Sequence, residues 1–466
     1  MPRYAEVLSF VQHLTPTWRK TQQANLAHLV RALLERPCLC LSELARSFPG
    51  PAQPLHGRLK RLTRFLDNPR LDELALPRRW LVLSHRFGTD PPDQPHDHPL
   101  VPILLDTTYF EPFAALVAAV ACGGRALPIA LTTYHRKALR ACLPARAGWD
   151  DPDAPPRRQS RRQAPALPRA FRSQNRIEQE LLDLVKSLCA PGLRPVMVAD
   201  RGFARASLFQ DLPTHGWEFV IRFDATTWVQ LEPGGPGQPA QTALAVAPGE
   251  RRWVPGGTYQ QHEQVSVNLL AVWDVGQAEP WYLATSLPRA DWAEVLYRWR
   301  MRIENSNRDE KTGVLLRQGG DAHELRNVLH LQRLLLALCT AQWLCALTGL
   351  QAAVDLAHPE PVDPTLANAL PTSADLDLLD QGPSLPPPVV PHRGPRAKPP
   401  PGLRRFVVRG PLSYVRLGLE VVRAKDLSAV FRRMVHWLGI YLWTYRPDWR
   451  PWHIRYRLRH WWLDSG

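Results

Sequence analysis

Apolar residues recur at helical spacing in the first 80 residues of the chain. In the segment 55–68, four leucines form one stripe: Leu55, Leu59, Leu62 and Leu66. Four basic residues lie largely off that stripe: Arg58, Lys60, Arg61 and Arg64. A helix that contacts DNA needs an apolar face opposite a basic one, and the preceding segment 41–48 fits a helix-turn-helix. An ordinary basic surface helix would show the same pattern, so both interpretations stay open.

From about residue 100 the pattern changes to short apolar runs separated by turns. Segments 101–110, 113–123 and 126–135 predict a three-stranded meander. A helix is predicted at 175–189, because its apolar residues return every three or four positions. The segment 195–204 predicts a buried strand that ends in Asp200, and after a short helix comes a further strand: 217–223. The predicted order is therefore β-β-β-α-β-α-β.

The second half of the chain alternates strands, long helices and prolines. Residues 224–285 hold strand-like pieces broken by Gly/Pro runs, which predicts an inserted β-rich region. One helix is expected to start near Asp291, and a second to span roughly 322–349. The second contains the most apolar run of the chain, which we interpret as a buried core helix rather than a membrane span. Residues 358–402 are proline-rich and predict a linker.

Charge is distributed unevenly over the 466 residues, which are enough for two or more domains. The net charge is +15, with 13 Lys/Arg against 6 Asp/Glu in residues 1–80 and 16 against 4 in residues 391–466. Two basic ends therefore flank a slightly acidic centre. A histone-like or ribosomal protein would be basic throughout, whereas this distribution fits an enzyme held on DNA. The basic end at 403–466 also holds six tryptophans, and it could contact target DNA or form a dimerisation element.

Other sequence features bear on compartment and cofactors. Seven scattered cysteines without a CxxC pair predict reduced thiols in a cytosolic protein, with neither zinc nor disulfides. The N-terminus lacks the uninterrupted apolar stretch of a signal peptide. There is no P-loop, so we expect no nucleotide cofactor, and HExxH and GxSxG are absent as well.

Three carboxylates are the candidate catalytic residues. Asp106 is placed at the end of the first predicted strand, Asp200 at the end of the fourth, and Glu304 on the helix after the insertion. If they converge, their mutual repulsion requires cations, and oxygen ligands favour Mg²⁺ or Mn²⁺. Two such ions about 4 Å apart can activate a water or a 3′-hydroxyl for in-line displacement at phosphorus. Taken singly, Asp106 could be a turn residue, and Asp200 could merely cap the following helix.

The helix that carries Glu304 has a distinctive polar face. Tyr297, Arg300, Glu304 and Lys311 lie at offsets 0, 3, 7 and 14, which fall within an arc of roughly 60° at 3.6 residues per turn. A carboxylate on this face can hold a metal ion, and the cations and the phenol can hold phosphates. A solvated face with Glu–Lys or Glu–Arg pairs is the alternative.

That spacing resembles the Y-x2-R-x3-E-x6-K motif of the DDE transposases of the insertion-sequence-four family. VMVADRGF (196–203) resembles the family's second-Asp motif, ILLDTT (103–108) its first, and WYLATS (281–286) its strand leading out of the insertion. The resemblance covers roughly 100–345 and is looser for 1–90. It implies an α/β fold with an RNase H-like core (100–349) and a β-rich insertion before the Glu-bearing helix. A helical N-terminal DNA-binding domain (1–90) and a helical basic C-terminal region (403–466) would flank this core.

The resemblance also implies roles for single residues. Asp106, Asp200 and Glu304 would form the metal-binding catalytic triad, with Mg²⁺ or Mn²⁺ as two ions. Arg300, Lys311 and Tyr297 would contact phosphates of the transposon end, and Arg58, Arg61 and Arg64 would bind DNA from the N-terminal domain. Trp281 could stack on a flipped base or be a core aromatic. One departure is Met301, where relatives often have Trp, with Trp299 on the other side of Arg300.

The function predicted from the sequence is cut-and-paste transposition. The enzyme would bind terminal inverted repeats, cleave DNA with metal ions and join the 3′-end to target DNA, as a homodimer on double-stranded DNA in the bacterial cytoplasm. No membrane partner is expected. The alternatives are an inactive or repurposed copy that only binds DNA, and an RNase H-like nuclease without strand transfer.

Overall fold

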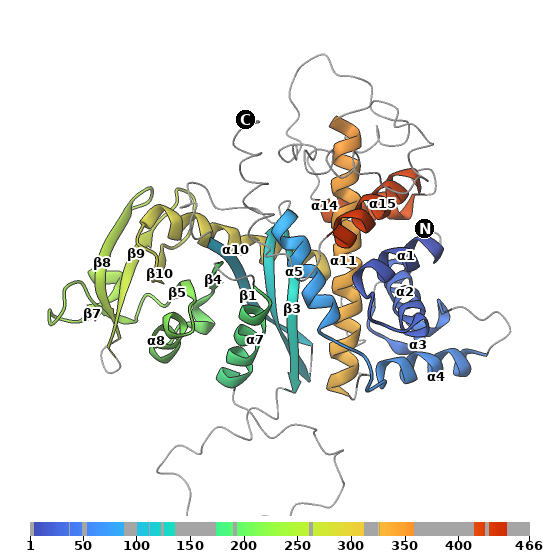
Figure 1. Ribbon diagram of the computed structural model, residues 1–466. Helices are drawn as coiled ribbons and strands as arrows, with labels where there is room; N and C mark the ends of the chain where they lie inside the picture. The colour runs from blue at the N-terminus through green and yellow to red at the C-terminus, as the bar shows by residue number, and fades with distance from the viewer. Residues whose placement is uncertain are drawn as a thin grey trace, which may run out of the picture.

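The computed structural model describes residues 4–36, 38–48, 54–87, 100–110, 112–122, 125–135, 174–189, 193–260, 264–311, 325, 327–357, 414–424 and 428–444. Figure 1 shows a helical N-terminal part, one large twisted sheet with helices on both of its faces, and a long helix, α11, between the two.

The N-terminal part is helical, as the sequence predicts. Its helices are α1 (Tyr4–Leu14), α2 (Lys20–Glu35), α3 (Leu41–Arg46), α4 (Leu55–Leu66) and α5 (Ala75–Phe87). Leu62 and Leu66 of the predicted apolar stripe are fully buried, and Phe65 packs beside them. Leu55, by contrast, is 40% exposed, because it begins α4 one turn before the packed stretch of the helix.

Ten strands form a single mixed sheet in the order β3-β2-β1-β4-β5-β10-β9-β8-β6-β7. The strands are β1 (Leu100–Phe110), β2 (Phe113–Cys122), β3 (Arg125–His135), β4 (Arg194–Ala199), β5 (Glu218–Phe223), β6 (Trp228–Gln230), β7 (Gln238–Pro239), β8 (Arg251–Tyr259), β9 (Val265–Val272) and β10 (Trp281–Thr285). The meander β1–β3 is confirmed. β1, β4 and β5 pair in parallel, and every other neighbour pair is antiparallel.

The predicted β-rich insertion does not form a separate body. Its strands, β6 to β10, continue the same sheet beyond β5, and only the short helix α9 (Ala240–Ala243) interrupts them. β10 returns between β5 and β9, so the chain enters the next helix from the middle of the sheet. The insertion therefore places the start of that helix opposite the central strands.

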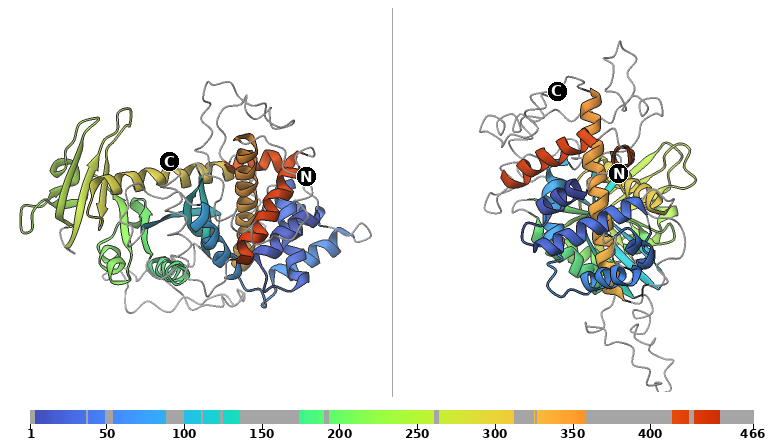
Figure 2. Two further views of the ribbon diagram at one scale, coloured as in Figure 1. Left: turned by 45° about the horizontal axis from the view of Figure 1, so that its top comes forward. Right: turned by 90° about the vertical axis from the view of Figure 1, so that its right-hand side faces the viewer.

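Helices cover both faces of the sheet, and each face has its own apolar cluster. Helices α5, α7 (Gln174–Leu188) and α8 (Ala206–Thr214) pack on one face. Helix α10 (Ala290–Lys311) packs on the other and crosses the strands from β9 to β3, as the left view of Figure 2 shows. Leu104, Val198 and Val220 contribute to the α10 cluster with Leu296 and Ile303 of the helix itself.

The long helix α11 spans Val328–Ala357 rather than the predicted 322–349. Its start is fixed by Asn327, whose side-chain oxygen accepts a hydrogen bond from the backbone N–H of Leu329 at 2.9 Å, as a helix cap does. By length and composition α11 could cross a membrane, but 94% of its most apolar window is buried inside the structure. This burial supports the interpretation as a core helix.

One side of α11 is bonded to strand β3. The Thr133 hydroxyl donates to the carbonyl oxygen of Val328 at 3.2 Å, and the Gln332 amide donates to that of Leu131 at 3.1 Å. Further along, the Trp343 indole N–H donates to the carbonyl oxygen of Pro128 at 2.7 Å. Bonds from several turns of the helix fix its position along the edge strand of the sheet.

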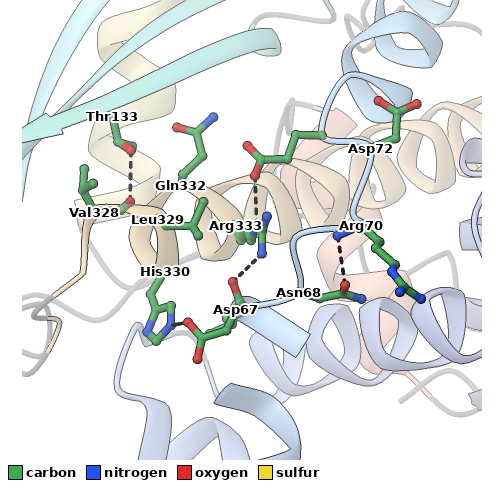
Figure 3. Close-up of polar contacts among 12 residues, drawn as sticks. Asp67, Asn68, Arg70, Asp72, Thr133, Val328, Leu329, His330, Gln332 and Arg333 are labelled. Atoms are coloured by element: carbon green, nitrogen blue, oxygen red, sulfur yellow. Dashed lines mark hydrogen bonds and ion pairs between the residues drawn. The ribbon is translucent and has the colours of Figure 1, made fainter. Parts of the chain in front are cut away.

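The other side of α11 is bonded to the end of α4 (Figure 3). Buried Arg333 donates to the carbonyl oxygen of Leu66 at 2.5 Å and to Glu73 Oε1 at 2.9 Å. His330 Nε2 lies 2.6 Å from Asp67 Oδ1. These contacts place a cation at the C-terminal end of α4, where the helix dipole favours one. Helix α11 therefore ties the N-terminal helices to the sheet.

Two C-terminal helices, α14 (Tyr414–Arg423) and α15 (Ser428–Thr444), pack against α11. A Cβ atom at Gly418 would overlap the carbonyl oxygen of Cys345, so α14 and α11 are in backbone contact at this point. The predicted helical character of the C-terminal region is confirmed for these residues. The linker predicted at 358–402 lies outside the described residues, and so does 445–466.

Candidate active site

Two of the three predicted carboxylates come just beyond the last pair of one parallel ladder: Asp106 lies within β1, and Asp200 directly follows β4. The β1–β4 ladder ends at the pair Leu104–Val198, and Asp106 and Asp200 each follow two residues later. Because side chains alternate along a strand, Asp106 lies on the same face as Leu104, which packs in the α10 cluster. Asp106 is partly buried.

The prediction that Asp106 ends its strand was wrong in one respect. β1 continues to Phe110, and Asp106 pairs with Val117 of β2. What ends near Asp106 is the pairing of β1 with β4. Asp106 thus lies where two parallel strands separate, which is the place expected for a ligand site in an open α/β sheet.

Asp200 caps a helix and also lies at the candidate site, the two roles that the sequence allowed. It caps a short 3₁₀ helix (Arg201–Phe203), because its Oδ1 accepts a hydrogen bond from the N–H of Gly202 at 2.9 Å. Its Oδ2 accepts one from Arg300 Nη2 of α10 at 3.2 Å. The Arg300 side chain is 9% exposed and that of Asp200 is 35% exposed. The carboxylate is therefore held by two donors and remains accessible from solvent.

Tyr297 lies one turn before Arg300 and is also buried against the sheet. Burial raises the pKa of its phenol above the usual value, while the nearby cations Arg300 and Arg222 oppose that rise. Arg222 comes from β5 and hydrogen-bonds the phenol. No pattern in the sequence indicated Arg222, because only the register between β5 and β10 brings it beneath α10.

Glu304 and Lys311 both belong to α10. Glu304 follows Arg300 by four positions, which in a helix is one turn along the same face. The side chains of residues 304–311 lie outside the described residues, so their predicted contacts stay predictions.

Aromatic residues surround this part of α10. Trp281 begins β10 and meets Tyr297 edge-to-face, with ring centroids 5.1 Å apart, while the Arg298 guanidinium lies 5.8 Å from the Trp281 ring. This packing matches the core-aromatic interpretation of Trp281. Trp299 is buried beneath Arg302, and Met301 is 42% exposed. Trp299 therefore points into the core, on a different side of α10 from Met301.

The opposite face of the sheet carries a buried ion pair that no sequence pattern indicated. Glu178 of α7 is 1% exposed and lies 2.5 Å from Arg205, the residue directly before α8. Burial raises the pKa of Glu178, and Arg205 opposes the rise. Because Arg205 lies five residues after Asp200, this pair anchors the segment that follows the candidate site.

The basic side chains predicted on α4 do not all point the same way. Arg58 donates to the carbonyl oxygen of Arg46 at 3.1 Å, at the end of α3. Arg61 donates from Nε to the Asn25 side-chain oxygen of α2 at 2.9 Å, and Arg64 is exposed. Arg61 and Arg64, with Lys60, line a hollow between α2 and α4.

The donor set at the site fits a divalent cation of the Mg²⁺ type. Asp106 and Asp200 offer only oxygen atoms, and Asp200 is reachable from solvent. Within the described residues, no three His, Cys, Asp or Glu side chains gather as a metal-binding group. The side chain of Glu304, the third predicted ligand, lies outside those residues.

Residues 172–344 match the family model described as "Transposase DDE domain". The matched range includes β4, Asp200 and α10 with Arg300 and Glu304. It begins after β1, so it does not include Asp106. No curated protein matches the chain. The match and the mixed α/β sheet support a DDE transposase, a class of enzyme that acts on DNA and generally uses divalent metal ions.

Proposed function

We propose that this protein is a cut-and-paste transposase of the insertion-sequence-four family that binds the terminal inverted repeats of its element. One observation carries the proposal. Asp106 and Asp200 each follow the last pair of the β1–β4 ladder by two residues, and Arg300, on the helix that carries Glu304, donates a hydrogen bond to Asp200. In this proposal the catalytic core is RNase H-like and occupies residues 100–349.

Asp106, Asp200 and Glu304 would hold Mg²⁺ or Mn²⁺, as two ions. When bound, the ions would activate the attacking hydroxyl and stabilise charge on the leaving oxygen at phosphorus. Arg300 already lies beside Asp200, so its guanidinium can hold a phosphate next to the carboxylates. Tyr297 and Lys311 would contact neighbouring phosphates. Tyr297 keeps its proton and can donate as a phenol, but it is 2% exposed, so this contact would require its side chain to become accessible.

The remaining parts of the chain have proposed roles as well. Residues 1–90 would bind DNA through α4, and the basic region 403–466 would serve target DNA or dimerisation. The enzyme would act as a homodimer on double-stranded DNA in the cytoplasm. Trp281 packs against Tyr297, so stacking on a flipped base would require it to leave that contact.

A cleavage assay tests the proposal. The full chain is incubated with duplexes that carry the DNA flanking its own gene, with and without Mg²⁺. We expect metal-dependent cleavage at the element ends, abolished in Asp106→Ala and Glu304→Ala. If either variant cuts as well as the parent, this mechanism is wrong. DNA binding without nicking would indicate an inactive or repurposed copy, and a failure to join pre-cleaved ends to target DNA would indicate a nuclease.

A further inference from the structure

An open hollow of about 520 Å³ lies between α2 and α4 of the N-terminal helices, and we call it the α2–α4 hollow. Its cations are consecutive or one turn apart on α4: Lys60, Arg61 and Arg64. Its lining, all from described residues, includes no Asp or Glu. An unneutralised group of three cations in a concave surface favours a polyanionic ligand.

The polar side chains around these cations are oriented as donors. The Asn25 oxygen accepts from Arg61 Nε at 2.9 Å, and the Asn68 oxygen accepts from the N–H of Arg70 at 3.0 Å. Both amide oxygens are used internally, so the NH₂ groups are the ends left for a ligand. The Gln22 amide accepts from the backbone N–H of Arg19 and donates to the carbonyl oxygen of Arg70, so this side chain lines the hollow with both ends of its amide already bonded. The hollow therefore offers hydrogen-bond donors and positive charge, which is what phosphate oxygens require.

The cations of the hollow are not neutralised from within the fold. No ion pair joins Lys60, Arg61 or Arg64 to a carboxylate within the part of the chain that the structure describes. Arg58, on the same helix, lies outside the lining and bonds Arg46 instead. The positive potential also acts on the neighbouring His28: burial, together with the cations Arg61 and Arg31, lowers its pKa to about 4.

Polar contacts join the end of α4, beside the hollow, to helix α11. Asn68 follows directly on Leu66 and Asp67, the residues that Arg333 and His330 of α11 hold in place (Figure 3). From Lys60 to Arg64 the charge extends along about 6 Å of helix, more than one phosphate group needs. A continuous sugar-phosphate backbone fits this distribution better than a single small anion does.

We propose that the α2–α4 hollow is a phosphate-binding site for one strand of duplex DNA, contacted by Lys60, Arg61, Arg64, Asn25 and Asn68. The proposal rests on the proposed function for its ligand, because it takes the partner to be DNA. It adds Lys60 and the two asparagines to the interface and removes Arg58 from it.

Binding of the full chain to a 30-base-pair duplex of mixed sequence, measured in EDTA over a range of salt concentrations, tests this site without cleavage. We expect Lys60→Ala/Arg61→Ala/Arg64→Ala to bind at least tenfold more weakly. The slope of log K against log salt should fall by about 0.9 for each phosphate that the variant no longer neutralises. The charge-matched control Arg176→Ala/Arg251→Ala/Arg252→Ala changes exposed residues outside the hollow and should keep most of the affinity.

A second variant separates binding from folding. Asn25→Asp keeps an oxygen for Arg61, so the helices stay joined, but it places a carboxylate at the edge of the hollow. We expect parent-like thermal stability and at least fivefold weaker DNA binding. Parent affinity and salt slope in both the Asn25→Asp and the triple variant would overturn the proposal, and so would a parent chain that does not bind the duplex.

Competition distinguishes the possible sources of phosphate. Inorganic phosphate at millimolar concentration should compete poorly with the duplex, and an RNA duplex of equal length should bind more weakly. Equal or tighter binding of the RNA duplex, or full competition by inorganic phosphate, would contradict a DNA site. Failure of the cleavage assay leaves these measurements interpretable, because they are made without metal and without cleavage.

Discussion

Arg333 of α11 forms an ion pair with Glu73, 2.9 Å from Nε to Oε1, and the same guanidinium bonds the last carbonyl of α4. The guanidinium is 7% exposed and the carboxylate 29% exposed. This one side chain therefore joins the helix that packs along β3 to the helix that lines the α2–α4 hollow. Removing its charge leaves Glu73 partly buried and unpaired, which is costly.

We expect Arg333→Met to destabilise the fold by about 2 kcal/mol, discounted for the exposure of Glu73. The matched control is Arg78→Met, which breaks an exposed pair with Asp72 and should cost less than about 0.5 kcal/mol. Urea unfolding of both variants checks the difference. Equal stability of the two variants would show that the ion pair contributes nothing to the junction.

Asp200→Asn should separate catalysis from folding. Asparagine is as good a helix cap as aspartate, so the bond from Gly202 is kept. The charge that pairs with nearly buried Arg300 is lost, so stability should fall by about 1–2 kcal/mol and the variant should still fold. The amide has no negative charge for a cation, and we expect cleavage to fall by about 100-fold or more. Asp211→Asn, on the exposed side of α8, is the control for cleavage. An active Asp200→Asn variant would remove Asp200 from the site.

The sequence predicted most of the fold because its apolar periodicity is strong. The meander from Leu100 to His135, the strand before Asp200 and the helix of Glu304 all follow from local pattern. Local pattern does not show pairing. It predicted a strand over 101–110, but it could not show that the pairing of β1 with β4 ends before Asp106 while the pairing with β2 continues to Phe110. It also could not show that β6 to β10 extend the same sheet.

The sequence predicted two parts of the candidate site: the polar face of α10 and the positions of Asp106 and Asp200 near strand ends. It did not predict the contacts between them. Arg222 reaches Tyr297 through the register of β5 with β10, and no spacing in the sequence encodes that contact. Likewise, the basic pattern of α4 grouped Arg58 with Arg61, although their head groups bond different helices. Contacts between elements distant in sequence are set by packing, which composition does not fix.

His28 predicts a dependence of stability on pH. It stacks on Tyr4 with ring centroids 4.1 Å apart, and its pKa is lowered to about 4 by burial and by Arg61 and Arg31. Between about pH 6.5 and 4 the unfolded chain therefore binds more protons at this position than the folded one. This contribution to stability is fully present above pH 6.5 and is lost as the pH falls through that window.

The contribution is about 1–2 kcal/mol, because the 1.36 kcal/mol for each unit of pKa is reduced by the partial exposure of His28 to solvent. We expect His28→Phe, which keeps an aromatic ring against Tyr4, to flatten the loss of stability between pH 7 and pH 4.5 in urea unfolding. His56→Gln, in an exposed histidine of α4, controls for the removal of a histidine as such. An unchanged pH profile in His28→Phe would show that other groups cause the acid sensitivity.

The basic C-terminal region can be tested only with a truncation that spares α14 and α15. Helix α14 is in backbone contact with α11 at Gly418, so deletion from residue 391 would expose the core helix and confuse folding with binding. Deletion of residues 445–466 removes five arginines and two aspartates and keeps both helices.

If the removed segment binds DNA, the shortened chain should bind a duplex more weakly, and the slope of log K against log salt should fall by about 0.9 for each phosphate that the segment neutralises. If the segment is a dimerisation element, the slope of log K against log salt for each protomer should stay the same. The mass of protein bound to DNA, measured by light scattering, should then fall by half. A shortened chain that matches the parent in both measurements would exclude both roles for residues 445–466.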